Sequence, residues 1–342
     1  MKALVLEKYM ELKYREVPDP VIKPGEVLVE VKASGICGSD IHGMDGSTGR
    51  RVPPVIMGHE ASGVISETGN DVTEWQAGDR VTFDSTIYRL DDWYTRKGLY
   101  NLSDGRMVLG VSAREFRRDG AYAEYVAVPA HILYKIPDNV SYTKAAMVEP
   151  AAVAMHAINL TPVELGDTAA VVGTGMIGLF IVQLLKLSGC SRVIAVDIDD
   201  EKLELAGQLG ATHLINPDKT GVDAILSLTE GRGADAAFEA VGTGPAVNTA
   251  VNTLRKGGTL TLVGNLHPMV EIPLQEIVTR QLRLQGSCAI NGEYRAVLDL
   301  MEQKLIDTDA ILSAEAPLHE GADWFKRLYN KEKGLIKVVL VP

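Results

Sequence analysis

The chain of 342 residues carries 45 acidic and 34 basic side chains, which gives it a formal charge of −11. Its hydrophobic fraction of 46% and charged fraction of 23% are ordinary for a folded α/β protein and argue against a disordered or fibrous chain. The negative charge disfavours nucleic acid as a partner, because binding to phosphate backbones requires clustered Lys and Arg. The length exceeds what one hydrophobic core usually supports, so two domains are expected.

Targeting signals and cysteine usage indicate the compartment. No basic and apolar leader precedes the first predicted strand, and the longest apolar stretch, at 176–185, is shorter than the roughly 20 residues that cross a bilayer. Three scattered cysteines, Cys37, Cys190 and Cys288, form no disulfide framework and favour a reducing compartment. We therefore expect a cytoplasmic protein without membrane contact.

The first part of the chain, up to about residue 138, predicts a β-rich domain. Short β-type runs such as 27–32 and 80–83 are separated by turns that contain Pro and Gly, as at 24–25. This pattern indicates a barrel-like architecture.

From about residue 166 the sequence alternates between apolar strands and amphipathic helices, which predicts a doubly wound parallel sheet. The six expected strands lie at 168–173, 192–197, 213–215, 235–239, 258–264 and 281–287. A helix that begins with acidic residues at 200 should end at Gly210, as dipole and C-cap preferences require. A helix at 294–304 and an alternating strand at 334–341 follow, and we expect the strand to return to the first domain.

Residues 173–178 read G-T-G-M-I-G, a G-x-G-x-x-G motif between an apolar strand and a helix. Such glycines permit a tight turn, close approach of a pyrophosphate, and close packing of helix and strand. Asp197 ends the next strand, where its carboxylate can bind ribose hydroxyls and repel a 2′-phosphate. Since 198–202 contain no Arg, NAD is favoured over NADP, and FAD or SAM are weaker alternatives. The expected cofactor-binding residues are Gly173, Gly175, Ile177, Gly178, Asp197, Lys202, Val263, Gly264 and Asn265.

Potential metal ligands and proton carriers gather in two short segments of the first domain. A thiol, a hydroxyl, a carboxylate and an imidazole occur within 37–42, and 59–60 add an imidazole and a carboxylate. Zinc at a catalytic site takes three or four N, S or O ligands and keeps one exchangeable position. The chemically suitable side chains are Cys37, His59, Glu60 and Glu149. Taken singly, a buried cysteine and a hydrogen-bonded loop histidine are commoner explanations, so the surrounding motif decides.

Five segments resemble the zinc-containing medium-chain dehydrogenase/reductase family, in family order and along essentially the whole chain. They are G-I-C-G-S-D at 35–40, G-H-E-A-S-G-V at 58–64, A-G-D-R-V at 77–81, G-A-Y-A-E-Y at 120–125 and V-E-P at 148–150. The resemblance implies a GroES-like catalytic domain, residues 1–152 and 290–342, and a Rossmann NAD-binding domain, residues 153–289. The Glu-Pro at 149–150 resembles the sequence that the polyol branch has at this position. This branch includes sorbitol (L-iditol), threonine, butanediol and galactitol-phosphate dehydrogenases.

The resemblance also implies the roles of individual residues. The implied zinc ligands are Cys37, His59, Glu60 and Glu149. For the two glutamates, direct contact and contact through water both stay open. Ser39 stands where the family has a hydroxyl that passes the alcohol proton inward. His42 would relay that proton toward solvent, with a plain surface histidine as the alternative.

The chain departs from this family at the structural zinc, which normally binds four cysteines. The corresponding positions are Arg89, Asp92, Thr95 and Ser103. None offers a thiolate, so we expect one catalytic zinc per chain and no structural zinc. An Arg89–Asp92 ion pair in place of the metal is our hypothesis. A second departure is the segment 286–291, where several polyol enzymes carry an arginine and this chain has none, which argues against sorbitol itself.

These features predict a zinc-dependent, NAD-linked enzyme that oxidises a secondary alcohol of a polyol or sugar-derived alcohol to the ketone or ketose. A hexitol-phosphate or L-threonine-type dehydrogenase is the alternative within the family. A non-catalytic NAD(H)-binding redox sensor is the alternative from another class. We expect a homodimer or homotetramer, joined at the edge strand near Leu282 and Leu284.

Overall fold

The computed structural model describes residues 1–111, 118–221 and 223–342, and the chain divides into two compact units. One unit comprises Met1–Glu149 and Ile290–Pro342, and the other comprises Pro150–Ala289. Within the described ranges, no helix is long and apolar enough to cross a membrane.

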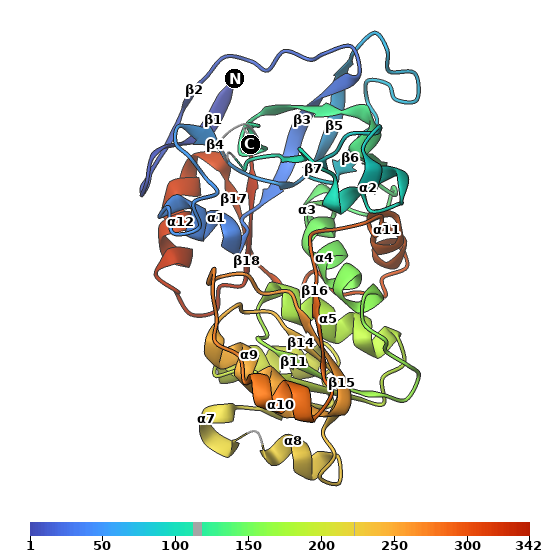
Figure 1. Cartoon of the computed structure of the whole chain (residues 1–342). Coiled ribbons are helices and arrows are strands. Elements are labelled where there is room, and N and C mark those ends of the chain that lie inside the picture. The colour runs from blue at the N-terminus through green and yellow to red at the C-terminus, as the bar shows by residue number, and fades with distance from the viewer. Residues whose placement is uncertain (112–117, 222) are drawn as a thin grey trace. The chain divides into compact units, whose positions relative to one another are not determined.

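The first unit is built on a seven-stranded, mainly antiparallel sheet with the order β10-β6-β5-β3-β18-β17, and β9 also pairs with β3. Its strands are β3 (Glu26–Gly35), β5 (Glu60–Thr68), β6 (Arg80–Phe83), β9 (Tyr125–Pro129), β10 (Leu133–Lys135), β17 (Leu312–Pro317) and β18 (Lys337–Val341). Figure 1 shows the red C-terminal strand beside the blue β3, with Val339 opposite Gly35. The prediction that the last strand returns to the first domain is therefore confirmed.

Alternation of apolar residues explains why β3 lies at the centre of this sheet. Val27, Val29 and Val31 are buried, while the residues between them are more accessible, as a strand with one core-facing side requires. A three-stranded sheet packs its own core nearby in the same unit. It consists of β1 (Lys2–Lys8), β2 (Glu11–Glu16) and β4 (Val55–Ile56), in the order β2-β1-β4.

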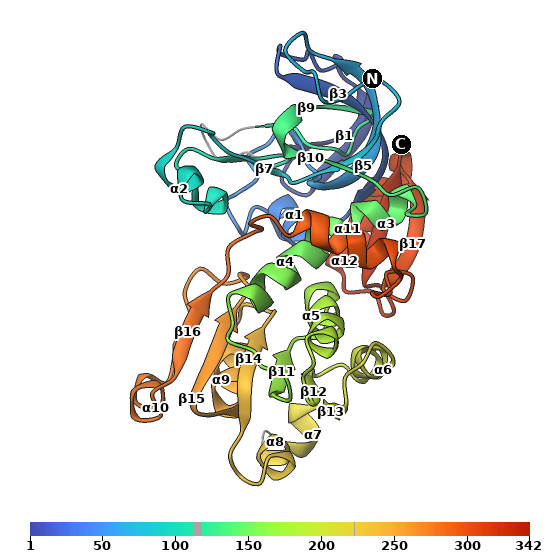
Figure 2. The same cartoon turned by 90° about the vertical axis from the view of Figure 1, so that its right-hand side faces the viewer.

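The second unit contains the predicted doubly wound sheet. Six strands are parallel and follow the order β13-β12-β11-β14-β15-β16, which Figure 2 shows side by side. They are β11 (Thr168–Val172), β12 (Arg192–Val196), β13 (His213–Ile215), β14 (Ala234–Glu239), β15 (Leu254–Leu262) and β16 (Arg283–Gly286). All five residues of β11 are buried, as expected for a central strand covered on both faces. The predicted fold class, a GroES-like β-rich unit plus a Rossmann unit, is confirmed.

The helices of this second unit follow the strands. They are α5 (Met176–Leu187), α6 (Asp200–Gln208), α7 (Pro217–Thr220), α8 (Asp223–Leu228), α9 (Gly244–Thr253) and α10 (Leu274–Thr279). Asp199 caps α6 by accepting a hydrogen bond from the Glu201 N–H at 3.0 Å, and Gly210 has a φ of 118° just beyond its end. The capping signals read from the sequence therefore bound this helix.

The remaining elements are helices, 3₁₀ turns and a pair of short strands that form a separate two-stranded sheet. The helices are α1 (Gly38–Met44), α2 (Trp93–Arg96), α3 (Tyr142–Ala146), α4 (Val148–Asn159), α11 (Tyr294–Glu302) and α12 (Gly321–Tyr329). The short strands are β7 (Thr86–Ile87) and β8 (Met107–Val108), and 3₁₀ turns cover Tyr100–Leu102, Ala130–Ile132 and Leu318–Glu320.

Hydrogen bonds organise the segment 89–103, which contains the four positions where the family has the cysteines of its structural zinc. Arg89 pairs with Asp91, at 3.1 and 3.0 Å, so the predicted Arg89–Asp92 ion pair is wrong. Asp92 instead caps α2, because it accepts two backbone N–H groups of that helix at 2.8 and 3.2 Å. An Asp that precedes a helix is better placed to bind these free N–H groups than to reach a neighbouring guanidinium.

Candidate metal and cofactor sites

Three potential zinc ligands converge in the first unit. Donor atoms of Cys37, His59 and Glu60 all lie within 4.8 Å of one another. Over residues 1–111, 118–221 and 223–342, this is the one such group of three or more His, Cys, Asp or Glu side chains. His59 and Glu60 are buried, and Cys37 is partly buried.

The pairing of two strands brings these side chains together. Strand β3 ends at Gly35, and Cys37 follows as the N-cap residue of α1. The register of β3 with β5 sets Gly35 opposite Glu60, the first residue of β5. The thiol just beyond one strand therefore faces the imidazole and carboxylate at the start of the other.

The donor set fits zinc. Sulfur, nitrogen and oxygen ligands bind Zn²⁺ at about 2.0–2.3 Å, so ligand atoms on one ion must lie within about 5 Å of one another. Oε1 of Glu60 is buried and has no hydrogen-bond partner, which leaves a carboxylate oxygen free for a cation. His59 Nδ1 lies 3.4 Å from Asp40 Oδ1, so Nε2 is the nitrogen that would be available to a metal.

Glu149, the fourth candidate ligand, lies near this group without belonging to it by distance. It stands in the first turn of α4. Burial raises the pKa of Glu149 to about 8, the charge of His59 lowers it, and the neighbouring carboxylate of Glu60 raises it further. A buried carboxyl group with a raised pKa in such surroundings is typical of a functional site.

A buried carboxylate, Asp40, connects the histidine to the rest of the unit. It accepts hydrogen bonds from Arg51 at 2.7 Å and from the Tyr122 hydroxyl at 2.7 Å, and it faces His59. Burial alone would raise the pKa of Asp40, but the charges of His59 and Arg51 hold it well below its usual range. The charge of Asp40 raises the pKa of His59 against the effect of burial, and its Oδ1 faces the Nδ1 side of the imidazole at 3.4 Å.

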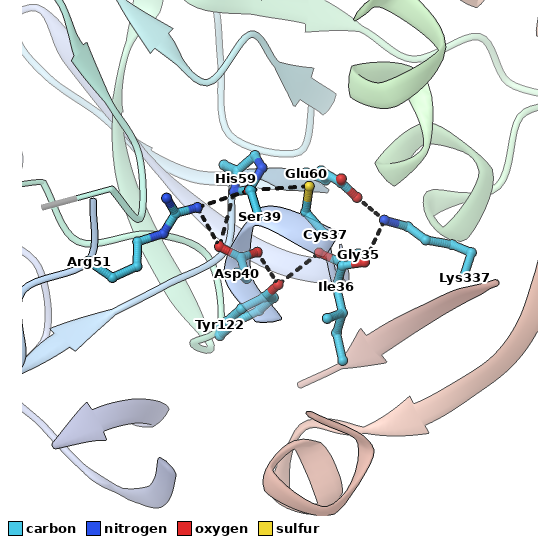
Figure 3. Close-up of polar contacts among 10 residues, drawn as sticks. All are labelled: Gly35, Ile36, Cys37, Ser39, Asp40, Arg51, His59, Glu60, Tyr122 and Lys337. Atoms are coloured by element: carbon cyan, nitrogen blue, oxygen red, sulfur yellow. Dashed lines mark hydrogen bonds and ion pairs between the residues drawn. The ribbon is translucent and has the colours of Figure 1, made fainter. Parts of the chain in front are cut away.

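Lys337, the first residue of β18, binds the other oxygen of Glu60. Its ammonium group donates to Glu60 Oε2 and, at 3.0 Å, to the Ile36 carbonyl oxygen. Figure 3 shows Arg51 and Lys337 reaching the cluster from opposite sides. A Cβ at Gly35 would overlap both Glu60 and Lys337, which explains the glycine that opens the 35–40 motif.

The structure separates the two predicted proton carriers. Ser39, in α1, donates to Cys37 Sγ at 3.3 Å and accepts a hydrogen bond from Arg51 at 3.1 Å. His42 is partly exposed and lies 4.0 Å from Asp45. In the part of the chain that the structure describes, no hydrogen bond joins Ser39 to His42.

Sequence reasoning assigned no role to the residues that surround the ligands. These are Asp40, Arg51, Tyr122 and Lys337. Asp40 and Tyr122 lie within the 35–40 and 120–125 motifs, which indicate the family but not the role of each residue. A lysine that begins the apolar strand 337–341 is itself a signal, because Lys is rarely buried without a partner. Arg51 has no comparable signal, because its partners lie about ten residues away along an irregular loop.

The glycine motif of the second unit adopts the expected geometry. Gly173 has a φ of 91°, a left-handed conformation that favours glycine, and follows β11 directly. A Cβ at Gly178 would overlap the carbonyl oxygen of Gly173, so helix α5 can approach the strand only without a side chain there. Gly175 faces open space, where a pyrophosphate can approach the first N–H groups of α5.

Asp197 is tied to this glycine loop. Its Oδ2 accepts hydrogen bonds from the Thr174 N–H at 2.7 Å and the Thr174 hydroxyl at 3.0 Å, and Oδ1 accepts the Asp199 N–H at 3.0 Å. The carboxylate therefore stands at the carboxyl end of β12 beside the loop after β11. Lys202, another predicted contact, lies 3.9 Å from Asp199.

The remaining predicted cofactor residues lie at the same edge of the sheet. Val263 and Gly264 follow β15, and both donate their N–H groups to the Glu239 carbonyl oxygen at 2.9 Å. A Cβ at Gly264 would overlap the backbone of Gly242, so these two loops pack closely. Carboxyl ends of neighbouring parallel strands form the usual binding edge of such sheets.

Comparisons with known proteins agree with both units. The alcohol dehydrogenase GroES-like domain matches residues 23–138, and the zinc-binding dehydrogenase domain matches residues 177–303. Among curated proteins, the chain is 32% identical to sorbitol dehydrogenase of Bacillus subtilis strain 168, over 100% of this chain and 97% of the relative. It is 31% identical to (R,R)-butanediol dehydrogenase of the same organism, over the whole length of both.

Two solved structures of similar proteins contain a nicotinamide cofactor. A zinc-binding dehydrogenase of Sinorhizobium meliloti 1021 bound to NADP superposes with a TM-score of 0.91 at 31% identity, covering 100% of this chain and 99% of that one. A short chain alcohol dehydrogenase of Escherichia coli CFT073, complexed with NADH, has a TM-score of 0.92 at 30% identity and the same coverage.

Proposed function

This chain belongs to the zinc-dependent medium-chain dehydrogenase/reductase family, in its polyol dehydrogenase branch, and from this premise we propose that it is an NAD-linked polyol dehydrogenase. The reaction is the reversible oxidation of one secondary alcohol, on a polyol or sugar-derived alcohol, to the ketone or ketose. The observation that carries the proposal is the convergence of Cys37, His59 and Glu60 within 4.8 Å beside the Ser39 hydroxyl.

Zinc in this site would be held by Cys37 and His59, with the two glutamates as oxygen ligands. Once bound, zinc lowers the pKa of an alcohol that occupies its open position. Asp40 orients the His59 ring, and Lys337 holds one oxygen of Glu60 while leaving the other free. These contacts keep the ligands in place before a metal binds.

Proton movement begins at Ser39. Its hydroxyl lies beside Cys37, where it can accept a hydrogen bond from the substrate alcohol. His42 is accessible to solvent and is the residue we propose for proton release. Because no direct hydrogen bond connects them in the described residues, this route needs a bridging water or a substrate hydroxyl.

NAD rather than NADP is the proposed cofactor, and it supplies the hydride acceptor. The carboxylate of Asp197 stands where the adenine ribose is recognised in this fold, and Asp199, Asp200 and Glu201 follow it. A 2′-phosphate would meet this negative charge without an arginine to neutralise it. The phosphate loop would bind either cofactor through backbone N–H groups, so it would not discriminate between them.

A homo-oligomer is also part of the proposal. Among the described residues, strand β16 forms one edge of the parallel sheet, and its outer side can bind the same strand of a second copy. Exposed apolar side chains occur nearby in sequence, at Met269, Leu274 and Val278. Light scattering on the purified protein distinguishes a monomer from a dimer or tetramer.

The test of function is NADH formation from NAD and a panel of alcohols. The panel contains polyols, 2,3-diols, sugar-acid alcohols, hexitol phosphates and threonine, each with and without a zinc chelator. Chelator-sensitive turnover of polyols or diols supports the proposal, and turnover of hexitol phosphates or threonine alone would select the alternative substrate class. NAD binding without turnover of any alcohol would support a redox sensor.

The Cys37→Ala variant provides the matched control for this assay. It removes the thiolate ligand and leaves the dinucleotide-binding residues of the second unit unchanged. We expect it to bind NAD as the wild type does and to lose turnover and zinc together.

A further inference from the structure

Arg51 is an unusual charge in the interior of the first unit. Only 2% of its surface is accessible, and no part of the predicted chemistry assigned it a function. A buried guanidinium requires partners that replace its hydration. One terminal nitrogen, Nη2, has two: Asp40 Oδ1 at 2.7 Å and Ser39 Oγ at 3.1 Å (Figure 3).

We propose that Arg51 is a positioning residue that holds the Ser39 hydroxyl in the orientation needed to accept a hydrogen bond from the substrate alcohol. This inference rests on the proposed dehydrogenase function. It goes further by assigning a role to a residue outside the recognised motifs. Arg51 keeps its own protons throughout, because a guanidinium does not deprotonate in proteins.

The hydrogen-bonding capacity of a hydroxyl explains the effect. A serine hydroxyl has one donor and two acceptor positions. Arg51 donates to one acceptor position of Ser39, and the hydroxyl hydrogen is directed at Cys37 Sγ, 3.3 Å away. One acceptor position remains, and it is the one available to an incoming alcohol.

The direction of the hydrogen bond between Arg51 and Ser39 is fixed, because a guanidinium donates hydrogen bonds and cannot accept them. Without Arg51, Ser39 Oγ could rotate about χ1 and turn its hydrogen toward the Asp40 carboxylate. Its free acceptor position would then point in a direction other than the one that Arg51 and Cys37 fix. Positioning errors of this kind reduce turnover rather than cofactor binding.

Arg51 is itself held on several sides. Asp40 fixes its guanidinium, and Tyr122 and His59 complete the surroundings of that carboxylate. Helix α1 has a glycine at position 43, where a Cβ would overlap Cγ of Arg51. The helix therefore leaves the space through which the arginine stem passes.

The contacts of the Arg51 guanidinium indicate that Arg51 positions Ser39 in addition to neutralising the charge of Asp40. Nε of Arg51 is buried without a hydrogen-bond partner, so the geometry does not satisfy the guanidinium fully. Neutralisation of Asp40 requires only the contact with its carboxylate, whereas Nη2 also donates to Ser39. The shared Nη2 instead joins the carboxylate that orients His59 to the hydroxyl beside Cys37.

A double-mutant cycle between Arg51 and Ser39 tests this role. The variants are Arg51→Met, Ser39→Ala and the double variant, assayed with NAD and sorbitol or 2,3-butanediol. We expect Arg51→Met to lower kcat by about 10- to 100-fold, a share of what a positioned proton acceptor contributes, with KM for NAD unchanged. In the Ser39→Ala background, the same substitution should change kcat by less than about twofold.

Tyr122→Phe is the matched control, because it removes a different hydrogen bond to Asp40 and does not touch Ser39. Its effect on kcat should multiply with that of Ser39→Ala. If Arg51→Met also multiplies with Ser39→Ala, Arg51 acts through Asp40 or through folding, and the proposal is overturned.

A crystal structure of Arg51→Met gives a readout that needs no turnover. We expect Ser39 Oγ to leave its position near Cys37 or to occupy two rotamers. An unchanged Ser39 rotamer would overturn the proposal even if activity falls. If the wild type oxidises neither alcohol, the dehydrogenase assignment for these substrates fails separately, and the crystal structure alone decides the role of Arg51.

Discussion

The ammonium group of Lys337, at the start of the last strand, is ion-paired with the carboxylate of Glu60, and neither side chain is accessible to solvent. They are 277 positions apart in the sequence, so the pair ties the C-terminal segment to the metal-ligand cluster. A buried pair adds little net stability when both partners are present. Removing one partner leaves an uncompensated charge in the interior.

We therefore predict that Lys337→Met lowers the free energy of unfolding by about 3–5 kcal/mol. The matched control is Lys144→Met, because Lys144 pairs with Asp309 at 2.7 Å on the surface and its loss should cost only about 0–1 kcal/mol. Urea denaturation of both variants measures the difference. Equal effects for the two substitutions would contradict the prediction.

Metal content provides the second prediction. We expect one zinc per chain by atomic emission, because one cluster of suitable ligands occurs in the described residues and the segment at 89–103 lacks thiolates. Cys37→Ala should reduce the zinc content toward zero, whereas Asp92→Asn, which keeps a side-chain acceptor for α2, should leave it at one. Two zinc ions per wild-type chain would disprove this stoichiometry.

Much of this organisation is predictable because it depends on local patterns. The six parallel strands, the return of strand 337–341 and the glycine loop follow from hydrophobic periodicity and from turn residues at fixed spacing. The 37–42 and 59–60 segments contain the converging ligands because motif residues stand at strand ends that pair directly.

The partners of the residues that support the ligands were not predictable, although Lys337 stands out as a charge at the start of an apolar strand. Arg51 and Lys337 reach their partners through tertiary packing, across an irregular loop in one case and most of the chain in the other. At Arg89 the error had a different cause. We predicted a pair with Asp92, three residues away, but Arg89 binds Asp91, two residues away, instead, and Asp92 is used to cap helix α2.

Asp197 should control cofactor choice. Asp197→Ala removes a carboxylate proposed to bind the ribose and loosens the Thr174 loop, so we expect NAD to bind about 10- to 100-fold more weakly. The preference for NAD over NADP should decrease at the same time, because the charge that repels a 2′-phosphate is gone. Calorimetric titration with both cofactors measures the two constants.

Asp199→Asn is the control for this experiment. It removes a neighbouring negative charge but retains the oxygen that caps α6. Its NAD affinity should stay within about twofold of the wild type, since one surface charge contributes little. Should both variants lose NAD equally, recognition would depend on total charge rather than on Asp197.

Asp84 gives a pH-dependent prediction. Burial raises the pKa of Asp84 from 3.8 to about 6, although the Tyr100 hydroxyl and the Thr86 N–H donate to it at 2.6 and 2.9 Å. A raised folded-state pKa means that the folded protein holds this proton longer than the unfolded chain does. The wild type therefore loses stability as the pH rises from about 4 to 6.

The Asp84→Asn variant cannot titrate at this position and should escape that loss. Its free energy of unfolding, relative to the wild type, should rise by about 2–3 kcal/mol between pH 4 and pH 7 and then stay level. Urea denaturation at pH 4, 5, 6 and 7 measures the trend. A difference that is independent of pH would show that Asp84 ionises normally in the folded protein.

Gly43 permits the last prediction, because a glycine inside a helix is normally a weak point. Replacing such a glycine with alanine usually stabilises a protein by about 0.5–1 kcal/mol. At Gly43 the added Cβ would overlap Cγ of Arg51, so overpacking, which costs about 1–3 kcal/mol, should dominate and give a net loss of about 1–2 kcal/mol. Gly38→Ala, in the same helix, has nothing within 4 Å of the new atom and should be neutral or stabilising. Urea denaturation of the two variants measures the free energy of unfolding of each. A gain in stability at both positions would mean that the space beside α1 is not reserved for Arg51.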